Sequence, residues 1–162
     1  NLPMAGFKFT GLGAGNAAGN SVRWEQIFAT GSAITLGPNA GTTGTTFTFD
    51  GSGGTSASKT IAYKILGQFL YINIPAVTAT SGTSSTVLAS NTALPAAARP
   101  AANHIYPLAQ TVDNGSSSAT MGLLVITTTG IIQIFRNSQA AAFTNASTCG
   151  INQGTTVVVF LG

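Results

Sequence analysis

The stretch TIAYKILGQFLYINIP, residues 60–75, constrains the fold more than any other part of the sequence. Apolar side chains recur at every second position on both sides of a Gly-Gln pair, which is the period of a β-strand. A glycine at the first central position suits a two-residue type II′ turn. The segment from Lys59 to Pro75 therefore predicts a β-hairpin. Both faces of its second strand are partly apolar, which indicates a core on one side and a neighbouring molecule or layer on the other.

Similar patterns recur along most of the chain, between clusters of Gly, Ser, Thr and Asn. A second hairpin is predicted around a Thr-Thr-Gly turn at Met121–Arg136, and further strands at Ala33–Leu36, Thr45–Phe49, Ile105–Leu108 and Thr155–Gly162. The prolines of LPAAARPA oppose a long helix there, and SVRWEQIF, residues 21–28, is the one short helix predicted. This spacing of short strands predicts an all-β fold, an antiparallel β-sandwich of jelly-roll type.

The composition excludes several classes of partner. Only 6% of the 162 residues are charged, so serine and threonine hydroxyls must make much of the surface's hydrogen bonding to water. The six basic residues are scattered, and a protein that binds nucleic acid needs a track of them, so we expect no nucleic-acid binding. No apolar run reaches the length of a membrane span, so membrane insertion is not expected. The start at Asn1 suggests a fragment or a processed product.

Metal and cofactor chemistry finds little support in the sequence. Cys149 is the only cysteine, which predicts a small buried hydrophobe and leaves no Cys-based metal cluster. His104 is the only histidine, and no Cys, Asp or Glu neighbours it. Copies of His104 brought together on a symmetry axis by several subunits would be the alternative. We predict no metal and no cofactor.

The glycine-rich segment FTGLGAGNAAGNSVRWEQ, residues 9–26, satisfies a relaxed dinucleotide-binding pattern at Gly13, Gly15 and Ala18. That reading also needs a buried parallel strand, a full helix and an acidic residue about 20 positions further on. The region near Pro38 contains no acidic residue, and the sequence does not predict the alternating strands and helices of a βαβ fold. The segment therefore predicts a closely packed or flexible connection.

The segment LPMAGFKFTGLGAGNAAGNSVRWEQ resembles the part of bacteriophage tail fibres that connects the shaft to a more globular distal part. The matching positions are Leu2, Pro3, Met4, Gly6, Phe7, Phe9, Leu12 and the Ala17-Ala18 spacer. The family usually places Asp-Ala where this chain has Asn20-Ser21. Further along, YKILGQFLYINIPAV, LPAAARPA and FTNASTCGI are similar to a hairpin, a linker and the penultimate loop of fibre tips. The resemblance covers residues 2–25 and 59–162, and the order of the motifs carries it.

This resemblance implies a homotrimeric receptor-binding protein on the virion, at the end of a tail fibre. Residues 1–30 would form the neck between shaft and tip, and residues 31–162 the β-sandwich tip. The tip would hold a bacterial surface glycan or an outer-membrane receptor, and the neck would join the rest of the tail fibre. A purely structural fibre or spike module is the first alternative.

A glycan-binding surface needs aromatic rings, amides, carboxylates and arginine on loops that a rigid scaffold holds. Trp24 is disfavoured because it lies in the predicted neck. The residues Tyr63, Phe69, Tyr71 and Phe135 alternate within strands, which predicts core or interface positions. The receptor-contact candidates are Tyr106, Asp113, Asn114, Arg136, Asn137, Asn145 and, as an imidazole, His104.

An enzyme that cuts glycans is the second alternative, and it would ordinarily need two carboxylates around the scissile bond. The chain has three acidic residues in all, Glu25, Asp50 and Asp113. Asp50 and Asp113 lie in turn-forming contexts, where Asp caps its own backbone. A catalytic pair would have to span subunits. Since no serine sits in a G-x-S-x-G elbow, we expect a non-enzymatic protein.

Overall fold

The computed structural model describes residues 40–118 and 121–162 of the chain. These residues form twelve β-strands and one short 3₁₀ helix, and no α-helix occurs among them. The all-β prediction is therefore confirmed. The elements in chain order are β1 (Ala40–Phe49), β2 (Ser56–Leu66), β3 (Phe69–Ile74), β4 (Val77–Thr80), β5 (Val87–Ser90), η1 (Ala96–Ala98), β6 (His104–Leu108), β7 (Val112–Asp113), β8 (Ser116–Ser117), β9 (Gly122–Ile126), β10 (Ile132–Phe135), β11 (Thr148–Ile151) and β12 (Thr155–Phe160).

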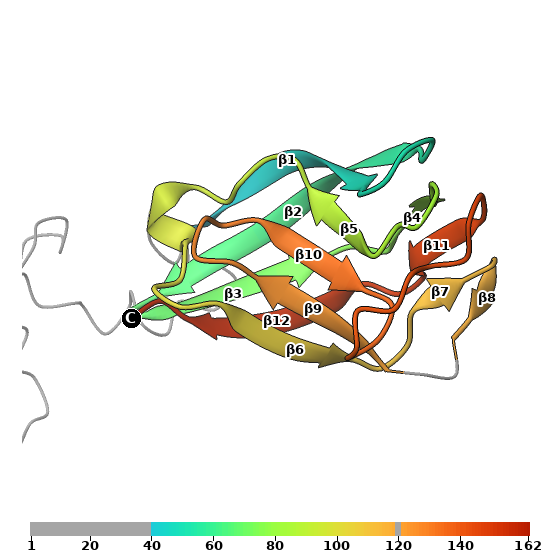
Figure 1. Cartoon of the computed structure of the whole chain (residues 1–162). Coiled ribbons are helices and arrows are strands. Elements are labelled where there is room, and N and C mark those ends of the chain that lie inside the picture. Colours follow the sequence, from blue (N-terminus) through green and yellow to red (C-terminus); the bar gives the residue numbers. More distant parts are fainter. Residues whose placement is uncertain (1–39, 119–120) are drawn as a thin grey trace, which may run out of the picture. The chain divides into compact units, whose positions relative to one another are not determined.

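The strands form two sheets, in which the paired neighbours run antiparallel. The large sheet has eight strands in the order β12-β3-β2-β1-β5-β10-β9-β6, and the small sheet has four in the order β4-β11-β7-β8. Figure 1 shows the small sheet at one end of the described residues, while β1 begins toward the opposite end. The predicted neck, the predicted helix at residues 21–28 and the predicted strand at residues 33–36 lie outside the described residues.

Both predicted hairpins are confirmed. Leu66 faces Phe69 across the first turn, and Gly67 has a φ of 60°, the positive value that a type II′ turn requires at this position. In the second hairpin β9 pairs with β10 from Ile126 and Ile132 onward. Gly130, with a φ of 82°, donates its amide to the carbonyl of Thr127 and closes the turn.

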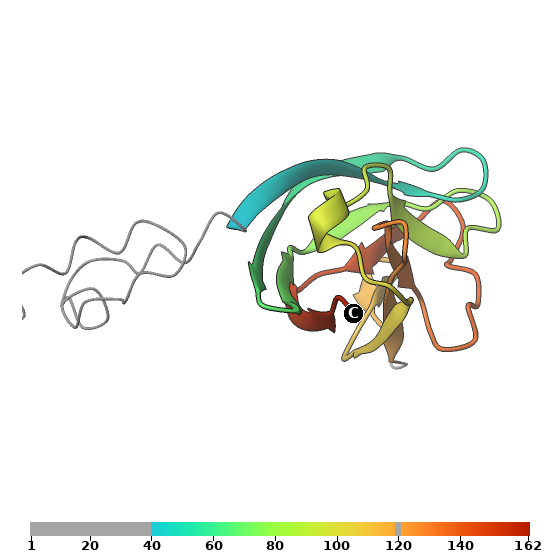
Figure 2. The same cartoon turned by 90° about the vertical axis from the view of Figure 1, so that its left-hand side faces the viewer.

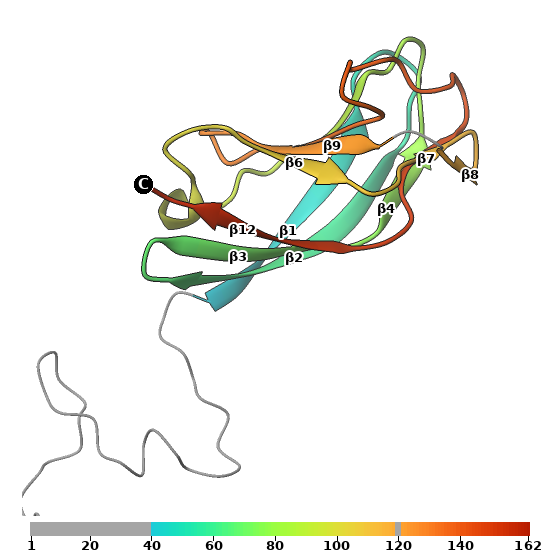
Figure 3. The same cartoon turned by 90° about the horizontal axis from the view of Figure 1, so that it is seen from below.

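The large sheet curls until its two edge strands meet. β1 pairs with β2 over most of its length but with β5 only at residues 47–49, so the sheet bends there. Figures 2 and 3 show that β12 and β6, the two edges, lie beside one another. The hydroxyl of Tyr106 on β6 donates to the carbonyl oxygen of Val158 on β12, at 2.6 Å. The result is an antiparallel sandwich that approaches a closed barrel.

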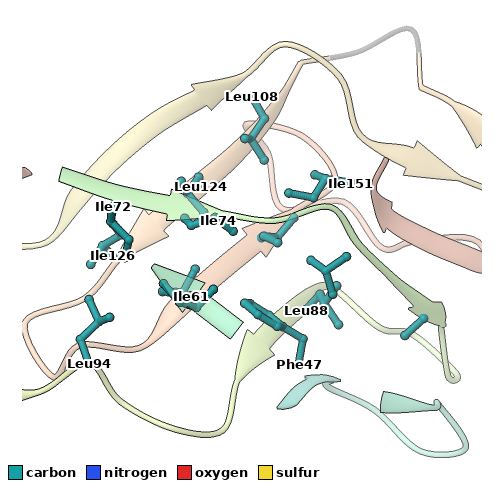
Figure 4. Packing of buried hydrophobic residues seen from close by; sticks show 14 of the residues in the cluster. Phe47, Ile61, Ile72, Ile74, Leu88, Leu94, Leu108, Leu124, Ile126 and Ile151 are labelled. Carbon is teal, nitrogen blue, oxygen red and sulfur yellow. The ribbon is translucent and has the colours of Figure 1, made fainter. Parts of the chain in front are cut away.

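The core lies inside this curled sheet. Alternate residues point inward along several strands, as in β3, where Leu70, Ile72 and Ile74 are fully buried and their neighbours are exposed. Figure 4 shows buried side chains from both layers, among them Phe47, Ile61 and Leu124, directed toward one another. Each fully buried side chain of this size contributes about 1.5–3 kcal/mol.

Five short strands were not predicted from the sequence. They are β4, β5, β7, β8 and β11, whose sequences are short and rich in Ser, Thr and small residues. Such composition is typical of loops. The segment FTNASTCGI, expected to be a loop, in fact ends in β11, because Cys149 and Ile151 are buried against strands far away in the sequence. As the prolines of LPAAARPA predicted, no long helix forms there, and the segment contains only η1.

Candidate functional site

The predicted receptor contacts fall into two groups. Asp113 belongs to β7, Asn114 follows it, and Arg136 and Asn137 follow β10, so these residues gather at the end that carries the small sheet. Asn145 precedes β11 at the same end. His104 and Tyr106, in contrast, lie within β6 rather than on a loop. The sequence predicted a single group of receptor contacts. In the fold, five of them lie at the small-sheet end, whereas His104 and Tyr106 lie on the edge strand β6.

Asp113 and Arg136 are the centre of the first group. The Arg136 guanidinium approaches the Asp113 carboxylate to 3.1 Å and also donates to the carbonyl oxygen of Ala142, at 2.7 Å. Thr144 donates its backbone amide and its hydroxyl to the same carboxylate, at 2.7 and 3.0 Å. Together these contacts fix the loop between β10 and β11. Asp113 thus ties a loop 31 residues away, rather than capping its own backbone as the sequence predicted.

This network affects the ionisation of Asp113. Burial of the Asp113 carboxyl opposes its ionisation, but the hydrogen bonds from Thr144 and Cys149 and the charge of Arg136 outweigh it, so the pKa of Asp113 is lowered. Burial raises the pKa of the Cys149 thiol. Cys149 is fully buried, as the sequence predicted, and its sulfur lies 3.3 Å from the Asp113 carboxylate. The charged form of Asp113 and the thiol form of Cys149 are both favoured.

Acid should therefore weaken the folded state through Asp113. The pKa of Asp113 is lower in the folded chain than the ordinary value of about 3.9, so its contribution to stability is complete above that value and is lost as the pH falls through the folded-state pKa. We expect the free energy of unfolding to fall more steeply below about pH 4 in the wild type than in Asp113→Asn, which cannot titrate there. Urea titrations at a series of pH values measure this difference. Equal acid slopes in the two proteins would contradict the assignment.

The three asparagines of this end are turn residues in the structure. The Asn137 side-chain oxygen accepts from the amides of Gln139 and Ala141, each at 3.0 Å. The Asn145 oxygen accepts from the Ser84 amide at 3.0 Å. Asn114 has a φ of 53° and forms the tight turn between β7 and β8. The side-chain oxygens of Asn137 and Asn145 bind backbone amides, and that of Asn114 accepts from the Ser147 hydroxyl at 2.8 Å, so any ligand contact would use the amide nitrogens.

His104 and Tyr106 stack on β6, with ring centroids 6.2 Å apart and an angle of 15° between the planes. The hydrogen bond from the Tyr106 hydroxyl to Val158 links the edge strands β6 and β12. Burial raises the pKa of Tyr106. Among residues 40–118 and 121–162, no group of three or more His, Cys, Asp and Glu side chains could hold a metal ion.

Asp50, the other carboxylate of the described residues, has a similar arrangement to Asp113. It accepts from the amides of Thr86 and Val87, at 2.6 and 2.7 Å, and from the Thr86 hydroxyl at 2.5 Å. The sequence placed Asp50 in a local turn, but its partners lie 36 and 37 residues further along the chain. Each carboxylate therefore accepts the amide and the hydroxyl of one threonine and joins two segments that are far apart in the sequence.

Two hollows open on the surface of the described part of the chain. The first, of about 460 Å³, lies where β6 and β9 meet the loop after β10, and we call it the β6–β9 pocket. Its lining combines Pro107, Met121 and Leu123 with Asn137, Ser138 and Gln139. The second, of about 530 Å³, is a polar groove over β1 and β2, lined among others by Thr46, Ser58, Lys59 and Asn91. Among the residues of the two hollows, only Asn137 was a receptor-contact candidate in the sequence. Met121 and Leu123 were missed because MGLL, residues 121–124, was interpreted as a hairpin arm.

The outer side of β2, β3 and β12 carries exposed apolar side chains. Leu66 faces Phe69, Phe69 faces Phe160, and Tyr71 faces Val158, all in adjacent strands. We call these five residues the apolar outer face. Phe69 is 47% exposed and Tyr71 41%, so neither is a core residue. Tyr63 packs against the core, and Phe135 is half-buried.

The chain matches no protein-family model and no curated protein. No helix of the described residues has the length and apolarity needed to cross a membrane.

Proposed function

We propose that this chain is the distal tip of a bacteriophage tail fibre, a homotrimeric, non-enzymatic module of the virion that binds a bacterial surface glycan or outer-membrane receptor. The ordered fibre-like motifs of the sequence support the family, and the exposed apolar outer face supports assembly. The single observation that carries the proposal is this face, because a monomer rarely leaves contiguous aromatic and aliphatic side chains in water.

The occupant that best fits the apolar outer face is a second copy of the same chain. The face contains no acidic residue, and Lys64, beside Tyr71 in the register, is its nearest cation. The Phe69 and Phe160 rings lie in contact, with centroids 5.6 Å apart, and form a continuous apolar ridge. Three such ridges around a common axis would bury one another, as closed cyclic symmetry requires. In this proposal, the two four-strand halves of the large sheet are the two layers of a jelly-roll-like tip in each copy.

The direction of the chain supports receptor binding at the small-sheet end. The described chain starts at β1, at the end of the sandwich opposite the small sheet (Figure 1). In a fibre the preceding residues would lead back to the shaft, so the small-sheet end would face the host cell. The loops there are held by the Asp113–Arg136 pair, which gives the rigid support that recognition loops need.

Mass and cell binding test this proposal together. We expect light scattering to give the mass of a trimer and the fluorescently labelled protein to bind host cells and to compete with phage adsorption. Phe69→Lys should shift the mass toward the monomer, because three buried ammonium groups would face one another at the axis. Thr48→Lys, at an exposed position of β1, is the matched control and should remain trimeric. A monomeric wild type that binds no cells would refute the proposal.

A structural fibre or spike module would share the trimer but not the cell binding. A trimer that neither binds cells nor competes with phage would therefore favour that alternative. In our proposal neither carboxylate of the described residues has a catalytic part, since Asp50 and Asp113 both hold loops. Shortening of host polysaccharide by the wild type, abolished by Asp50→Asn or Asp113→Asn in a folded trimer, would instead favour a depolymerase.

A further inference from the structure

The β6–β9 pocket is built from two different kinds of structure. Its apolar side comes from adjacent strands, with Pro107 of β6 facing Leu123 of β9 in the register. Its polar side comes from Asn137, Ser138 and Gln139, on the loop that follows β10. A regular sheet therefore supplies one wall and a short loop supplies the other.

The loop wall is fixed in position before any ligand arrives. The Asn137 side chain accepts two amides of its own loop, and Arg136 donates to the carbonyl oxygen of Ala142 beyond it. Arg136 is itself held by Asp113. Loops ordered in this way lose less conformational entropy on binding, so even a small ligand can bind measurably.

The lining of the pocket indicates the class of ligand. None of its residues is charged, and it offers amide and hydroxyl groups beside the apolar surfaces of Pro107, Met121 and Leu123. A neutral sugar residue has the matching surfaces, since its ring carries C–H groups on its faces and hydroxyl or acetamido groups at its edge. The volume of about 460 Å³ falls within the range of about 300–1,000 Å³ that is usual for small-ligand pockets.

The polar groove over β1 and β2 fits a sugar less well. The Thr46 amide already donates to the Asn91 side chain, and the Thr46 and Ser58 hydroxyls bond to each other. The groove is lined by Gly, Thr, Ser, Asn and Lys59, so no aliphatic or aromatic residue lies in its wall. It therefore serves as a control site of similar size on the same molecule.

We propose that the β6–β9 pocket binds one neutral sugar residue of a bacterial surface glycan, with the Asn137 and Gln139 amides and the Ser138 hydroxyl at its hydroxyl or acetamido groups. This proposal rests on the receptor-binding function proposed above and names its ligand class and its site. Asp113 and Arg136, which the sequence offered as ligand contacts, become positioning residues that hold the pocket wall. A millimolar site would suffice, because a trimeric tip and several fibres bind by avidity.

Amide chemical shifts of the full chain test the pocket directly. Glucose, a 6-deoxyhexose, N-acetylglucosamine and glucuronate are titrated separately to millimolar concentrations. We expect at least one neutral sugar to shift the Leu123, Ser138 and Gln139 amides, and glucuronate to shift them less. Ser138→Trp, at an exposed position, should fill the pocket and weaken that binding by about tenfold or more, or about 1.4 kcal/mol. Ser58→Trp, in the polar groove, should leave it unchanged.

The possible results separate this proposal from the proposed function. If no neutral sugar shifts the pocket amides, or if Ser138→Trp binds as the wild type does, the pocket is not the sugar site. Shifts caused by a short peptide and by no sugar would overturn the ligand class. If the Ser138→Trp trimer still binds cells and competes with phage fully, the site fails while the receptor-binding function stands. If the wild type binds no cells at all, the function itself fails.

Discussion

Replacing Asp50 with alanine is expected to lower the free energy of unfolding by about 2–4 kcal/mol, a large share of the roughly 5–15 kcal/mol of a typical domain. The Asp50 carboxylate accepts the amides of Thr86 and Val87 and the Thr86 hydroxyl, all within 2.7 Å. Alanine leaves these donors without their acceptor and removes the side-chain link between the start of β5 and the end of β1, whose backbone pairing remains. Thermal or urea unfolding of the two proteins measures the loss.

Two further variants separate the contacts of Asp50. Asp50→Asn keeps an oxygen that can accept from an amide, so it should lose about half as much stability as Asp50→Ala. Thr86→Ala removes only the hydroxyl and should cost about 1 kcal/mol. Asp50→Ala with wild-type stability would mean that the segment before β5 is held to Asp50 by other contacts, such as the Ser85 hydroxyl bound to the Asp50 carbonyl oxygen at 2.5 Å.

Gly150→Ala should be at least as damaging. Gly150 lies in β11, an inner strand of the small sheet, opposite both Thr78 and Val112, with a φ of 135°. A side chain strains the backbone in this region, and a Cβ added here would overlap the carbonyl oxygen of Val77. Because backbone atoms cannot rotate away, we expect a loss of about 3 kcal/mol or more, seen as a lower urea midpoint or as failure to fold.

Gly44→Ala provides the matched control for this prediction. Gly44 lies in β1 and has no atom within 4 Å of the position that its Cβ would take. Alanine there should change stability by no more than about 1 kcal/mol, and in the stabilising direction, because it restricts the unfolded chain. Equal stability of the two variants would show that the small sheet adapts to the added methyl group. Near-wild-type stability of Gly150→Ala would contradict the packing described here.

The hairpins were predictable because both of their strands and the turn lie close together in the sequence. The alternation around Gly67 and the Thr-Thr-Gly turn were sufficient to place β2, β3, β9 and β10. The small sheet was not predictable in the same way. Its central strand, β11, reads TCGI and pairs with β4, about 70 residues earlier along the chain. Nothing local in four such residues indicates a buried strand.

The candidate site was likewise predictable only in part. The sequence pointed to Asp113, Arg136 and Asn137 because these residue types suit glycan binding, and the fold does bring them to one end. It could not show that Asp113 and Arg136 bind to each other and to the loop of residues 142–144. Nor could it show that Met121 and Leu123 line a pocket with Asn137.

Local sequence patterns and composition were therefore sufficient to predict the all-β class, the main hairpins, the alternation of buried and exposed side chains, and the scarcity of charge. These properties depend on neighbours in the chain and on composition. Tertiary contacts, in contrast, set the curl of the sheet that brings Tyr106 to Val158, the links that Asp50 and Asp113 make between distant segments, and the position of the pocket. Such contacts join residues separated by tens of positions, and their geometry exists only once the core has closed the chain on itself.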